Sequence, residues 1–400
     1  MNILFVTTKT PLPMDDGHSL RDFNILRQLA KKHRIHLISA VKARREWESL
    51  NELQKICASV QLVAVPANRS KLALAVTLIN SLLRQRAFVV SKYNLPGIRQ
   101  AIRKTLAENT IDLIHLSVLP LAVYLDEVAG YPVTLDEHNV ESALLRQRLT
   151  AETGIRRLFF RWQQEWLEIF ERDAVRRADH ILACSKIDAS LLRQLAPGTP
   201  VSLIANGVDR DYFQPQIVEE EKESLVFVGG LDWHPNIDGL HWFDREILPQ
   251  LIIQHPDLRL HVIGGGPQPQ WRHKDHIVCH GRVEDIRPYM ARAAIFIVPL
   301  RIGGGTRLKI LNAMATGCCV VATGIGAAGL DAVDGENILI GDSAQDFAAR
   351  ILTALATASF REQIARKAVQ FIEDNYDWNL IGEKLRAEIS SLARKRDDQP

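Results

Sequence analysis

Three consecutive glycines ahead of a helical pattern make the stretch of the chain best suited to bind an anion. Gly303, Gly304 and Gly305 follow an apolar run, and a helical pattern covers Thr306–Thr316. Glycine lets backbone N–H groups approach a ligand closely, and a helix N-terminus presents unpaired N–H groups and the positive end of its dipole. A strand, a glycine loop and a helix start in this order therefore predict a phosphate-binding site.

Two cations and an amide lie on the same expected helix. Arg307 and Lys309 are in its first turn, and Asn312 follows Lys309 by three residues, so that both project from one face. A phosphate bound near Lys309 would place Asn312 beside the group that the phosphate carries, such as a ribose. The alternative is that the glycines form only a flexible connection. Because glycines alone are a weak signal, the prediction depends on the two cations.

The composition is that of an ordinary globular protein. The chain has 400 residues, enough for two or three domains, with 46% hydrophobic and 24% charged residues. A net charge of +2 gives no overall basic field, so we expect no nucleic-acid partner. Five cysteines without a C-x-x-C pair indicate neither zinc nor a disulfide framework, which suits the reducing cytoplasm. The first residues predict a strand rather than a signal peptide, and no apolar stretch is long enough to span a bilayer.

Strand and helix patterns alternate along most of the chain, which predicts an α/β protein. The strands are continuous apolar runs, as expected of parallel sheets that are covered on both faces. A polar stretch without periodicity, residues 209–224, interrupts the alternation. We therefore predict two Rossmann-like doubly wound domains, 1–208 and 225–375, joined by this linker. Residues 376–400 are expected to form a C-terminal helix that returns toward the first domain and ends in a frayed tail. In such folds ligands bind at the carboxyl ends of the strands, here in a cleft between two domains.

Seven short motifs, in order along the chain, resemble those of one enzyme family. In the first domain they are Asp16–Arg21 (DGHSLR), Asp136–Asn139 (DEHN), Ala178–Ser185 (ADHILACS) and Asn206–Asp209 (NGVD). In the second they are Val226–Leu231 (VFVGGL), Gly281–Val283 (GRV) and the glycine stretch within Ile295–Ala322. With these motifs the chain resembles the nucleotide-sugar-dependent glycosyltransferases of the GT-B fold, in the large retaining group called glycosyltransferase family 4.

The resemblance implies a donor nucleotide on the second domain and an acceptor, a glycan or a lipid-linked hydroxyl, on the first. Its catalytic residues would be Arg307 and Lys309, which hold the diphosphate, and His138, which lies by the donor sugar. The substrate-binding residues that it implies are Gly17, His18, Arg21, Gly229, Gly230, Arg282, Val283, Gly304, Gly305, Thr306 and Asn312. The leaving phosphate would take the acceptor proton, so neither a carboxylate pair nor a metal nor a cofactor is required. The implied role is in polysaccharide or cell-envelope glycan synthesis.

Two positions depart from the family pattern. Asn312 stands where the family usually has a glutamate that accepts bonds from both ribose hydroxyls. Losing that charged hydrogen bond would weaken nucleotide binding by on the order of 1–2 kcal/mol. After Gly229 and Gly230, many members have an arginine and a lysine that this chain lacks. Arg307 and Lys309 must therefore supply the cations for the diphosphate.

Several of these residues have a structural alternative. His138 follows a strand and could cap the next helix, and His18 could be an ordinary residue of a first helical turn. Asp16 could serve only as a helix cap, and Arg282 could be a surface charge. The sequence does not decide between these roles.

Two helical segments carry apolar stripes beside arginines. In Arg156–Arg177 the stripe includes Leu158, Trp162 and Trp166, and Leu72–Leu83 is followed by two arginines. Packing in the core is the expected explanation. The alternative is a basic amphipathic face in contact with anionic lipid. A lipid-linked acceptor would favour that alternative, with a cytoplasmic protein in peripheral contact with the inner face of the membrane.

Two other functions remain open. An epimerase that acts on a nucleotide sugar would share the two-domain fold, but it would change the donor without any acceptor. A catalytically silent subunit that only binds the nucleotide sugar would fit the absence of the glutamate at Asn312. A dehydrogenase is disfavoured, because Gly264–Gly266 lacks the G-x-G-x-x-G spacing.

Overall fold

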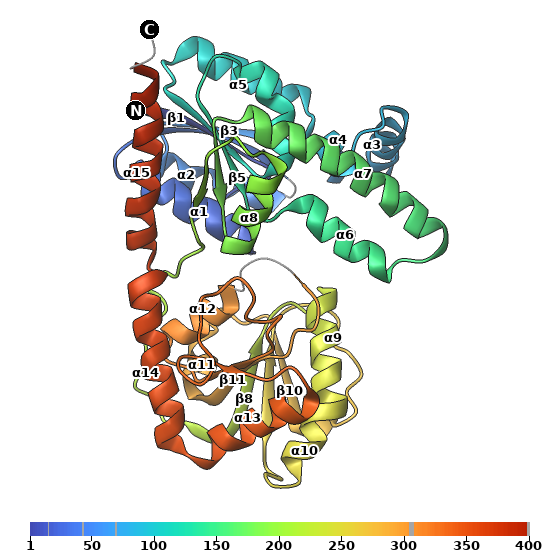
Figure 1. Cartoon of the computed structure of the whole chain (residues 1–400), viewed down its shortest axis with the longest axis vertical. Coiled ribbons are helices and arrows are strands. Elements are labelled where there is room, and N and C mark those ends of the chain that lie inside the picture. Colours follow the sequence, from blue (N-terminus) through green and yellow to red (C-terminus); the bar gives the residue numbers. More distant parts are fainter. Residues whose placement is uncertain (15, 42–43, 69, 304–307, 398–400) are drawn as a thin grey trace. The chain divides into compact units, whose positions relative to one another are not determined.

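The computed structural model describes residues 1–14, 16–41, 44–68, 70–303 and 308–397 (Figure 1). These residues form two compact units. The first comprises Met1–Ala205 together with Gly382–Pro400, and the second comprises Asn206–Ile381. Each unit is an α/β structure built on a parallel sheet.

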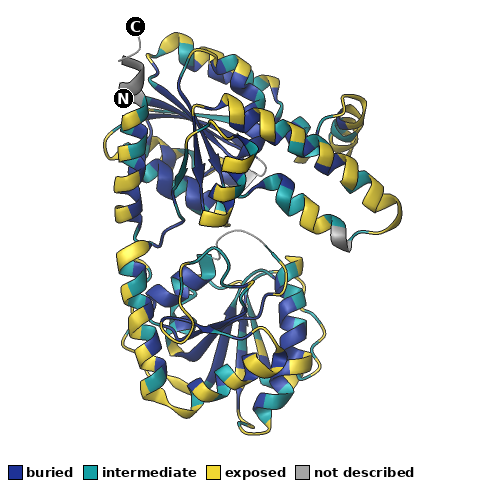
Figure 2. Ribbon diagram, in the orientation of Figure 1, coloured by how far each residue is buried: buried dark blue, intermediate teal, exposed yellow. Residues whose placement is uncertain are grey.

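The first unit contains a seven-stranded parallel sheet in the order β3-β2-β1-β4-β5-β6-β7. Its strands are β1 (Asn2–Thr7), β2 (Arg34–Val41), β3 (Ser59–Ala64), β4 (Leu113–Ser117), β5 (Val133–Glu137), β6 (His180–Ala183) and β7 (Val201–Leu203). The central strands are buried along almost their whole length (Figure 2), as their continuous apolar runs predict. The strand order reverses between β1 and β4, which places the topological switch point, where ligands of such sheets bind, at the ends of these strands.

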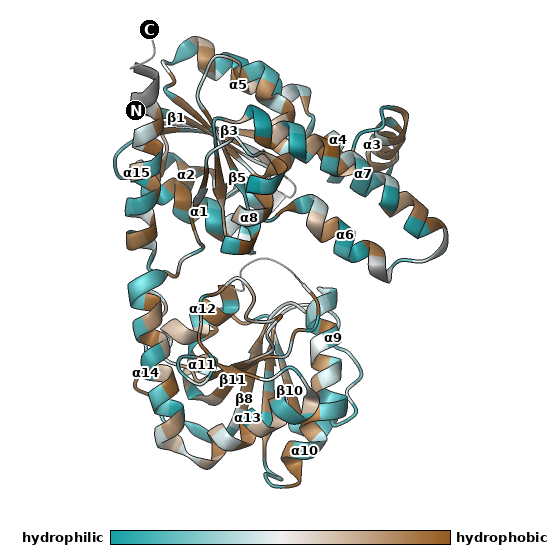
Figure 3. Ribbon diagram, viewed as in Figure 1, coloured by the Kyte–Doolittle hydropathy of each residue, from teal (hydrophilic) through white to brown (hydrophobic). Residues whose placement is uncertain are grey.

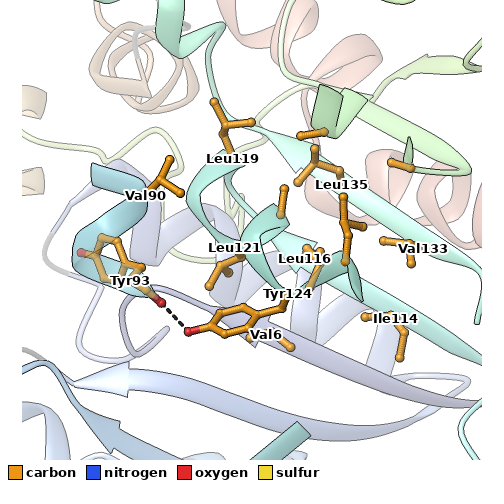
Figure 4. Packing of buried hydrophobic residues seen from close by; sticks show 14 of the residues in the cluster. Val6, Val90, Tyr93, Ile114, Leu116, Leu119, Leu121, Tyr124, Val133 and Leu135 are labelled. Carbon is orange, nitrogen blue, oxygen red and sulfur yellow. Dashed lines mark hydrogen bonds between the residues drawn. The ribbon is translucent and has the colours of Figure 1, made fainter. Parts of the chain in front are cut away.

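Helices cover both faces of this sheet. They are α1 (Gly17–Ala30), α2 (Leu50–Ile56), α3 (Lys71–Leu83), α4 (Phe88–Tyr93), α5 (Pro96–Glu108), α6 (Glu141–Ala151), α7 (Gly154–Arg177) and α8 (Lys186–Leu195). The segment η3 (Leu119–Val128) is a 3-10 helix that carries a proline in its first turn. Its Tyr124 belongs to the buried hydrophobic core (Figure 4), and its hydroxyl donates to the carbonyl of Tyr93. This bond satisfies a polar group that would otherwise be buried without a partner.

The second unit contains a six-stranded parallel sheet in the order β10-β9-β8-β11-β12-β13. Its strands are β8 (Glu221–Val228), β9 (Arg259–Ile263), β10 (Ile277–Gly281), β11 (Ala293–Val298), β12 (Val320–Ala322) and β13 (Leu339–Ile340). Strand β8 begins inside the stretch expected to be a linker, and Glu221 pairs with Ala293. The first residues of β8 are charged and exposed, so the hydrophobic pattern of the sequence does not indicate where the strand begins.

The helices of the second unit are α9 (His234–Trp242), α10 (Leu248–Ile252), α11 (Arg287–Arg292), α12 (Leu308–Ala315), α13 (Ala344–Ala356) and α14 (Ala358–Asn375). A π-helical turn, Phe243–Ile247, separates α9 from α10. Pro249 follows at once in α10 and has no N–H for the hydrogen-bond ladder, which accounts for the break.

The last helix, α15 (Trp378–Asp397), begins in the second unit and belongs to the first unit from Gly382 onward. Trp378 is buried in the second unit, where the ring packs against Gly207. In the first unit, Arg386 Nη1 donates to the side-chain and backbone oxygens of Gln28, at 2.8 and 3.2 Å. The helix therefore makes specific contacts in each unit.

Candidate functional site

The start of α1 lies beside the carboxyl end of β1, and Asp16 there contacts Lys9, which follows the strand. Asp16 is the N-cap, and its carboxylate accepts a hydrogen bond of 2.9 Å from the backbone N–H of Ser19. Lys9 Nζ lies 2.8 Å from the same carboxylate. Although burial opposes the charge, hydrogen bonds from Lys9 and Ser19 lower the pKa of Asp16 to about 2. Asp16 therefore has the capping role that the sequence offered as an alternative. Gly17 opens the helix directly after it.

Asp22, one turn into α1, is the centre of a buried polar network. Its carboxylate accepts hydrogen bonds from the hydroxyls of Thr7 on β1 and Ser117 on β4. The Nε2 atoms of His18 and His138 lie 3.1 and 3.4 Å from its oxygens. Asp22 is fully buried, and although burial opposes ionisation, the two imidazoles hold its pKa well below the ordinary value. Sequence reasoning missed Asp22, although its i,i+4 spacing from His18 was a usable signal.

A second buried carboxylate, Asp136 at the end of β5, is fixed by Arg21. The guanidinium donates from Nε and Nη2 to the two carboxylate oxygens at 2.9 and 2.6 Å, a bidentate pair. Arg21 Nη1 donates to the carbonyl of Ile204 at 2.9 Å. Both partners of the pair are buried. The family resemblance assigns Arg21 to substrate binding, whereas in the structure its guanidinium holds Asp136.

His138 lies between these two carboxylates. Its Nε2 is 3.4 Å from oxygens of both Asp22 and Asp136, and its ring centroid is 4.8 Å from that of His18. Burial alone would lower the pKa of His138, but hydrogen bonds and attraction from the two carboxylates raise it to about 9. Helix α6 has Val140 as its N-cap, so His138 does not cap that helix. The arrangement produces an imidazolium at neutral pH, able to donate a hydrogen bond at the carboxyl ends of the central strands.

In the second unit, Lys309 is held at the glycine turn that follows β8. Lys309 Nζ donates to Asn236 Oδ1 at 2.9 Å, and Asn236 Nδ2 donates to the carbonyl of Gly230 at 2.8 Å. The ammonium also lies 4.4 Å from the centroid of the Phe227 ring. A Cβ on Gly229 would come within 2.6 Å of both Lys309 Nζ and Asn236 Nδ2, which explains the glycine. Asn236 is buried, and sequence reasoning missed it, because nothing local links it to a lysine 73 residues away.

The glycine loops that end three neighbouring strands adjoin one another. Gly264, after β9, has a φ near 159°, and a Cβ there would lie 2.0 Å from the carbonyl oxygen of Gly229. The backbone N–H of Leu231 donates to Gly265 O at 2.7 Å. The Cβ of Arg282, after β10, faces Gly265. Three predicted residues therefore lie in adjoining loops: Gly229 and Gly230 after β8, and Arg282 after β10.

The remaining predicted residues lie on or before α12 and after β10. Arg282 is exposed and Val283 is half-buried, in the loop that follows β10. Asn312 is half-buried on α12, three residues after Lys309. The predicted residues that lie outside the described part of the chain are Gly304, Gly305, Thr306 and Arg307. Of the two cations expected to hold the diphosphate, the structure thus describes Lys309.

Two Rossmann-like units, each with polar groups gathered at the carboxyl ends of a parallel sheet, define a GT-B architecture. Two family models match consecutive parts of the chain. The model described as Glycosyltransferase Family 4 matches residues 23–212, and the model described as Glycosyl transferases group 1 matches residues 222–357. The chain belongs to this family of glycosyltransferases.

Relatives and solved structures agree with this assignment. A phosphatidyl-myo-inositol mannosyltransferase of Mycolicibacterium smegmatis is 23% identical over 314 residues, 72% of this chain and 74% of that protein. An uncharacterized 44.6 kDa protein from the cps region of Klebsiella pneumoniae is 29% identical over 165 residues, 38% of this chain and 42% of that protein, so this match spans less than half of the relative.

Two solved structures share the fold. Sucrose-phosphate synthase from Thermosynechococcus elongatus has a TM-score of 0.74 at 16% identity, over 98% of this chain and 99% of that chain. HepE from Anabaena, solved in complex with UDP-glucose, has a TM-score of 0.65 at 16% identity, over 98% of this chain and all of that chain. At such identities these likenesses concern the fold alone.

Proposed function

We propose that this glycosyltransferase moves a sugar from a nucleoside-diphosphate sugar to a hydroxyl of a glycan or lipid-linked acceptor, in polysaccharide or cell-envelope glycan synthesis. The observation that carries the proposal is the anchored ammonium of Lys309 beside the glycine turn after β8. A cation held in place before the ligand arrives neutralises the diphosphate charge that grows as the leaving group departs. The binding of UDP-glucose by HepE, which has a similar fold, supports a nucleotide-sugar donor.

In this proposal the transfer runs with retention at the anomeric carbon and without a metal or cofactor. The leaving phosphate takes the proton of the acceptor hydroxyl, so the pair of carboxylates that glycosidases use is not needed. His138 donates a hydrogen bond to a sugar hydroxyl, and its charge is maintained by Asp22 and Asp136. We propose that the reaction takes place in the cytoplasm, and at the inner face of the membrane when the acceptor is a lipid.

A turnover assay tests the proposal. The full chain is supplied with a panel of nucleoside-diphosphate sugars and lipid extracts or oligosaccharides as acceptors, and the release of nucleoside diphosphate is measured. One donor should be consumed in an acceptor-dependent way, and Lys309→Ala should abolish its consumption while Lys367→Ala, an exposed lysine on α14, should not. Product NMR should show the anomeric configuration of the donor. An inverted product would overturn retention, and donor change without an acceptor would favour an epimerase.

The residue type at Asn312 favours one alternative function. A neutral amide stands where the family usually has a glutamate for the ribose, and this favours a catalytically silent subunit that binds a nucleotide sugar. Slow hydrolysis of the donor without acceptor would exclude this rival. A protein that binds the donor but never cleaves it would establish the rival instead.

A further inference from the structure

Helix α3 exposes apolar side chains around most of its circumference. Leu72, Ile79 and Leu83 are 75%, 55% and 77% exposed, and Leu74, Val76 and Leu82 are exposed as well. The one buried residue of the helix is Ser81. Figures 2 and 3 together show α3 as both solvent-exposed and hydrophobic. A helix on a globular surface normally turns its apolar stripe toward a core, so this exposure indicates an interaction site.

The N-terminal half of α7 also exposes apolar side chains. Ile155, Leu158 and Trp162 are 84%, 46% and 43% exposed. The expectation that this stripe packs in the core is therefore wrong for these residues, although Trp166 and Phe170, further along the helix, do pack against the core. Helix α3 is joined to α7 near this point, because Ser81 Oγ lies 3.5 Å from Gln163 Nε2.

Arginines accompany the exposed apolar residues along the chain. Arg84 and Arg86 follow α3, and Arg156, Arg157 and Arg161 lie on α7; Arg86 is half-buried and the other four are exposed. Arg156 and Arg161 form ion pairs with glutamates of the same region at 3.2 and 3.0 Å, but surface pairs of this kind contribute little and are easily exchanged. The surface thus combines large apolar groups with guanidinium groups that can bind phosphate.

An apolar groove of about 320 Å³ opens beside this surface, between α4, α6 and α7. Its lining includes Phe88, Leu145 and Phe159. Arg148 also lines it, and the guanidinium carbon of Arg148 lies 4.1 Å from the centroid of the Phe160 ring. A groove of this composition is suited to a hydrocarbon chain whose polar end meets a cation.

We propose that the exposed apolar residues of α3 and of the first half of α7, with their five arginines, form a surface that binds an anionic lipid bilayer; we call it the α3–α7 surface. The apolar side chains enter the headgroup region, and the arginines pair with lipid phosphates. A second copy of this chain is a poorer occupant, because a two-fold symmetric contact would bring the same arginines together from both copies. This inference rests on the proposed function with a lipid-linked acceptor. It adds the residues by which the protein would contact the bilayer.

Flotation with vesicles tests the inference without donor or turnover. The full chain should bind vesicles of phosphatidylcholine mixed with phosphatidylglycerol, bind pure phosphatidylcholine much more weakly, and dissociate as salt is added. Because each basic residue near an anionic surface contributes about fivefold in affinity, Arg84→Glu with Arg86→Glu should weaken binding at least ~25-fold. Leu72→Ser with Ile79→Ser should weaken it on the order of 100-fold if both side chains enter the lipid.

Matched controls come from the second unit. Ile253→Ser removes an isoleucine that is 81% exposed, and Arg366→Glu reverses an arginine whose side chain is 72% exposed; both should leave vesicle binding unchanged. All variants should keep wild-type melting temperatures and wild-type affinity for nucleoside diphosphate, so a failure here is distinct from a failure of the proposed function. Absence of binding by the wild type, or equal weakening by the controls, would overturn the inference. Concentration-dependent dimers that Leu72→Ser with Ile79→Ser abolishes would assign the surface to a second copy instead.

Discussion

Replacing His138 with glutamine should remove a pH-dependent part of the stability of the first unit. His138 Nε2 lies 3.4 Å from oxygens of Asp22 and Asp136, and both carboxylates are fully buried. Against the effect of burial, their hydrogen bonds and charges raise the pKa of His138 from its ordinary value near 6.5 to about 9. Glutamine keeps a hydrogen-bond donor at this position but cannot carry the charge.

The pKa of His138 gives the size and the sign of the effect. The difference between 6.5 and about 9 corresponds to about 3 kcal/mol in the free energy of unfolding. Because the pKa is raised in the folded state, this contribution is complete below about pH 6.5 and is lost as the pH rises through about 9. Burial opposes the charge of both carboxylates. The pKa of Asp22 is lowered by His18 and His138, and that of Asp136 is lowered first by Arg21 and then by His138; the part due to His138 is the same attraction and is not added to it.

Urea unfolding of the wild type and His138→Gln across this pH range provides the assay. The chain folds as two compact units, so the comparison is made on the unfolding step that the substitution shifts. The wild type should be more stable by about 3 kcal/mol near pH 6, and the difference should shrink toward zero near pH 10. A difference that stays constant with pH would refute the reasoning, as would an NMR titration that places the pKa of the His138 imidazole at or below 6.5.

Three further substitutions test other parts of the account. Asn236→Ala should raise the Kd for the bound nucleoside diphosphate about tenfold by calorimetry, because Lys309 loses the amide that holds it; unchanged affinity would contradict this role. Asn312→Glu should tighten the same binding by on the order of 1–2 kcal/mol by supplying a charged acceptor for the ribose, and equal or weaker binding would exclude that explanation. Arg21→Met should lower the free energy of unfolding by about 3–5 kcal/mol, because Asp136 would remain buried without its partner; a loss below about 1 kcal/mol would contradict the importance of the pair.

The architecture could be predicted from the sequence because the signal is repeated. Most strands contain an apolar run, and most are followed by a helical pattern, so errors in single elements do not change the fold class. The errors in element boundaries arose where the hydrophobic pattern of the sequence does not show a local feature of the backbone. The charged start of β8 looked like a linker, and the π-turn before Pro249 interrupted a helix whose apolar periodicity ran on.

The candidate site was only partly predictable, for a different physical reason. His138 and Lys309 stand out because each follows a strand or a glycine loop in the chain. Asp22 and Asn236 do not, because their roles depend on side chains that the folded sheets bring to them from β1, β4 and α12. The exposed face of α3 was visible as an apolar helix, but only the structure shows that no core covers it.

No helix in the described part of the chain is long and apolar enough to cross a membrane. The lipid contact proposed for the α3–α7 surface involves exposed side chains, and its strength should depend on lipid charge and on salt.

The central claim, a nucleotide-sugar donor held through Lys309, is tested most directly by a thermal-shift screen of nucleoside diphosphates and their sugars. The wild type is compared with Lys309→Ala and with the control Lys367→Ala. A ligand that binds only the folded protein raises the melting temperature by mass action. The account predicts that one nucleotide raises it in the wild type and in the control, and has no effect on Lys309→Ala. No rise with any nucleotide at millimolar concentration, or an equal rise in Lys309→Ala, would contradict it.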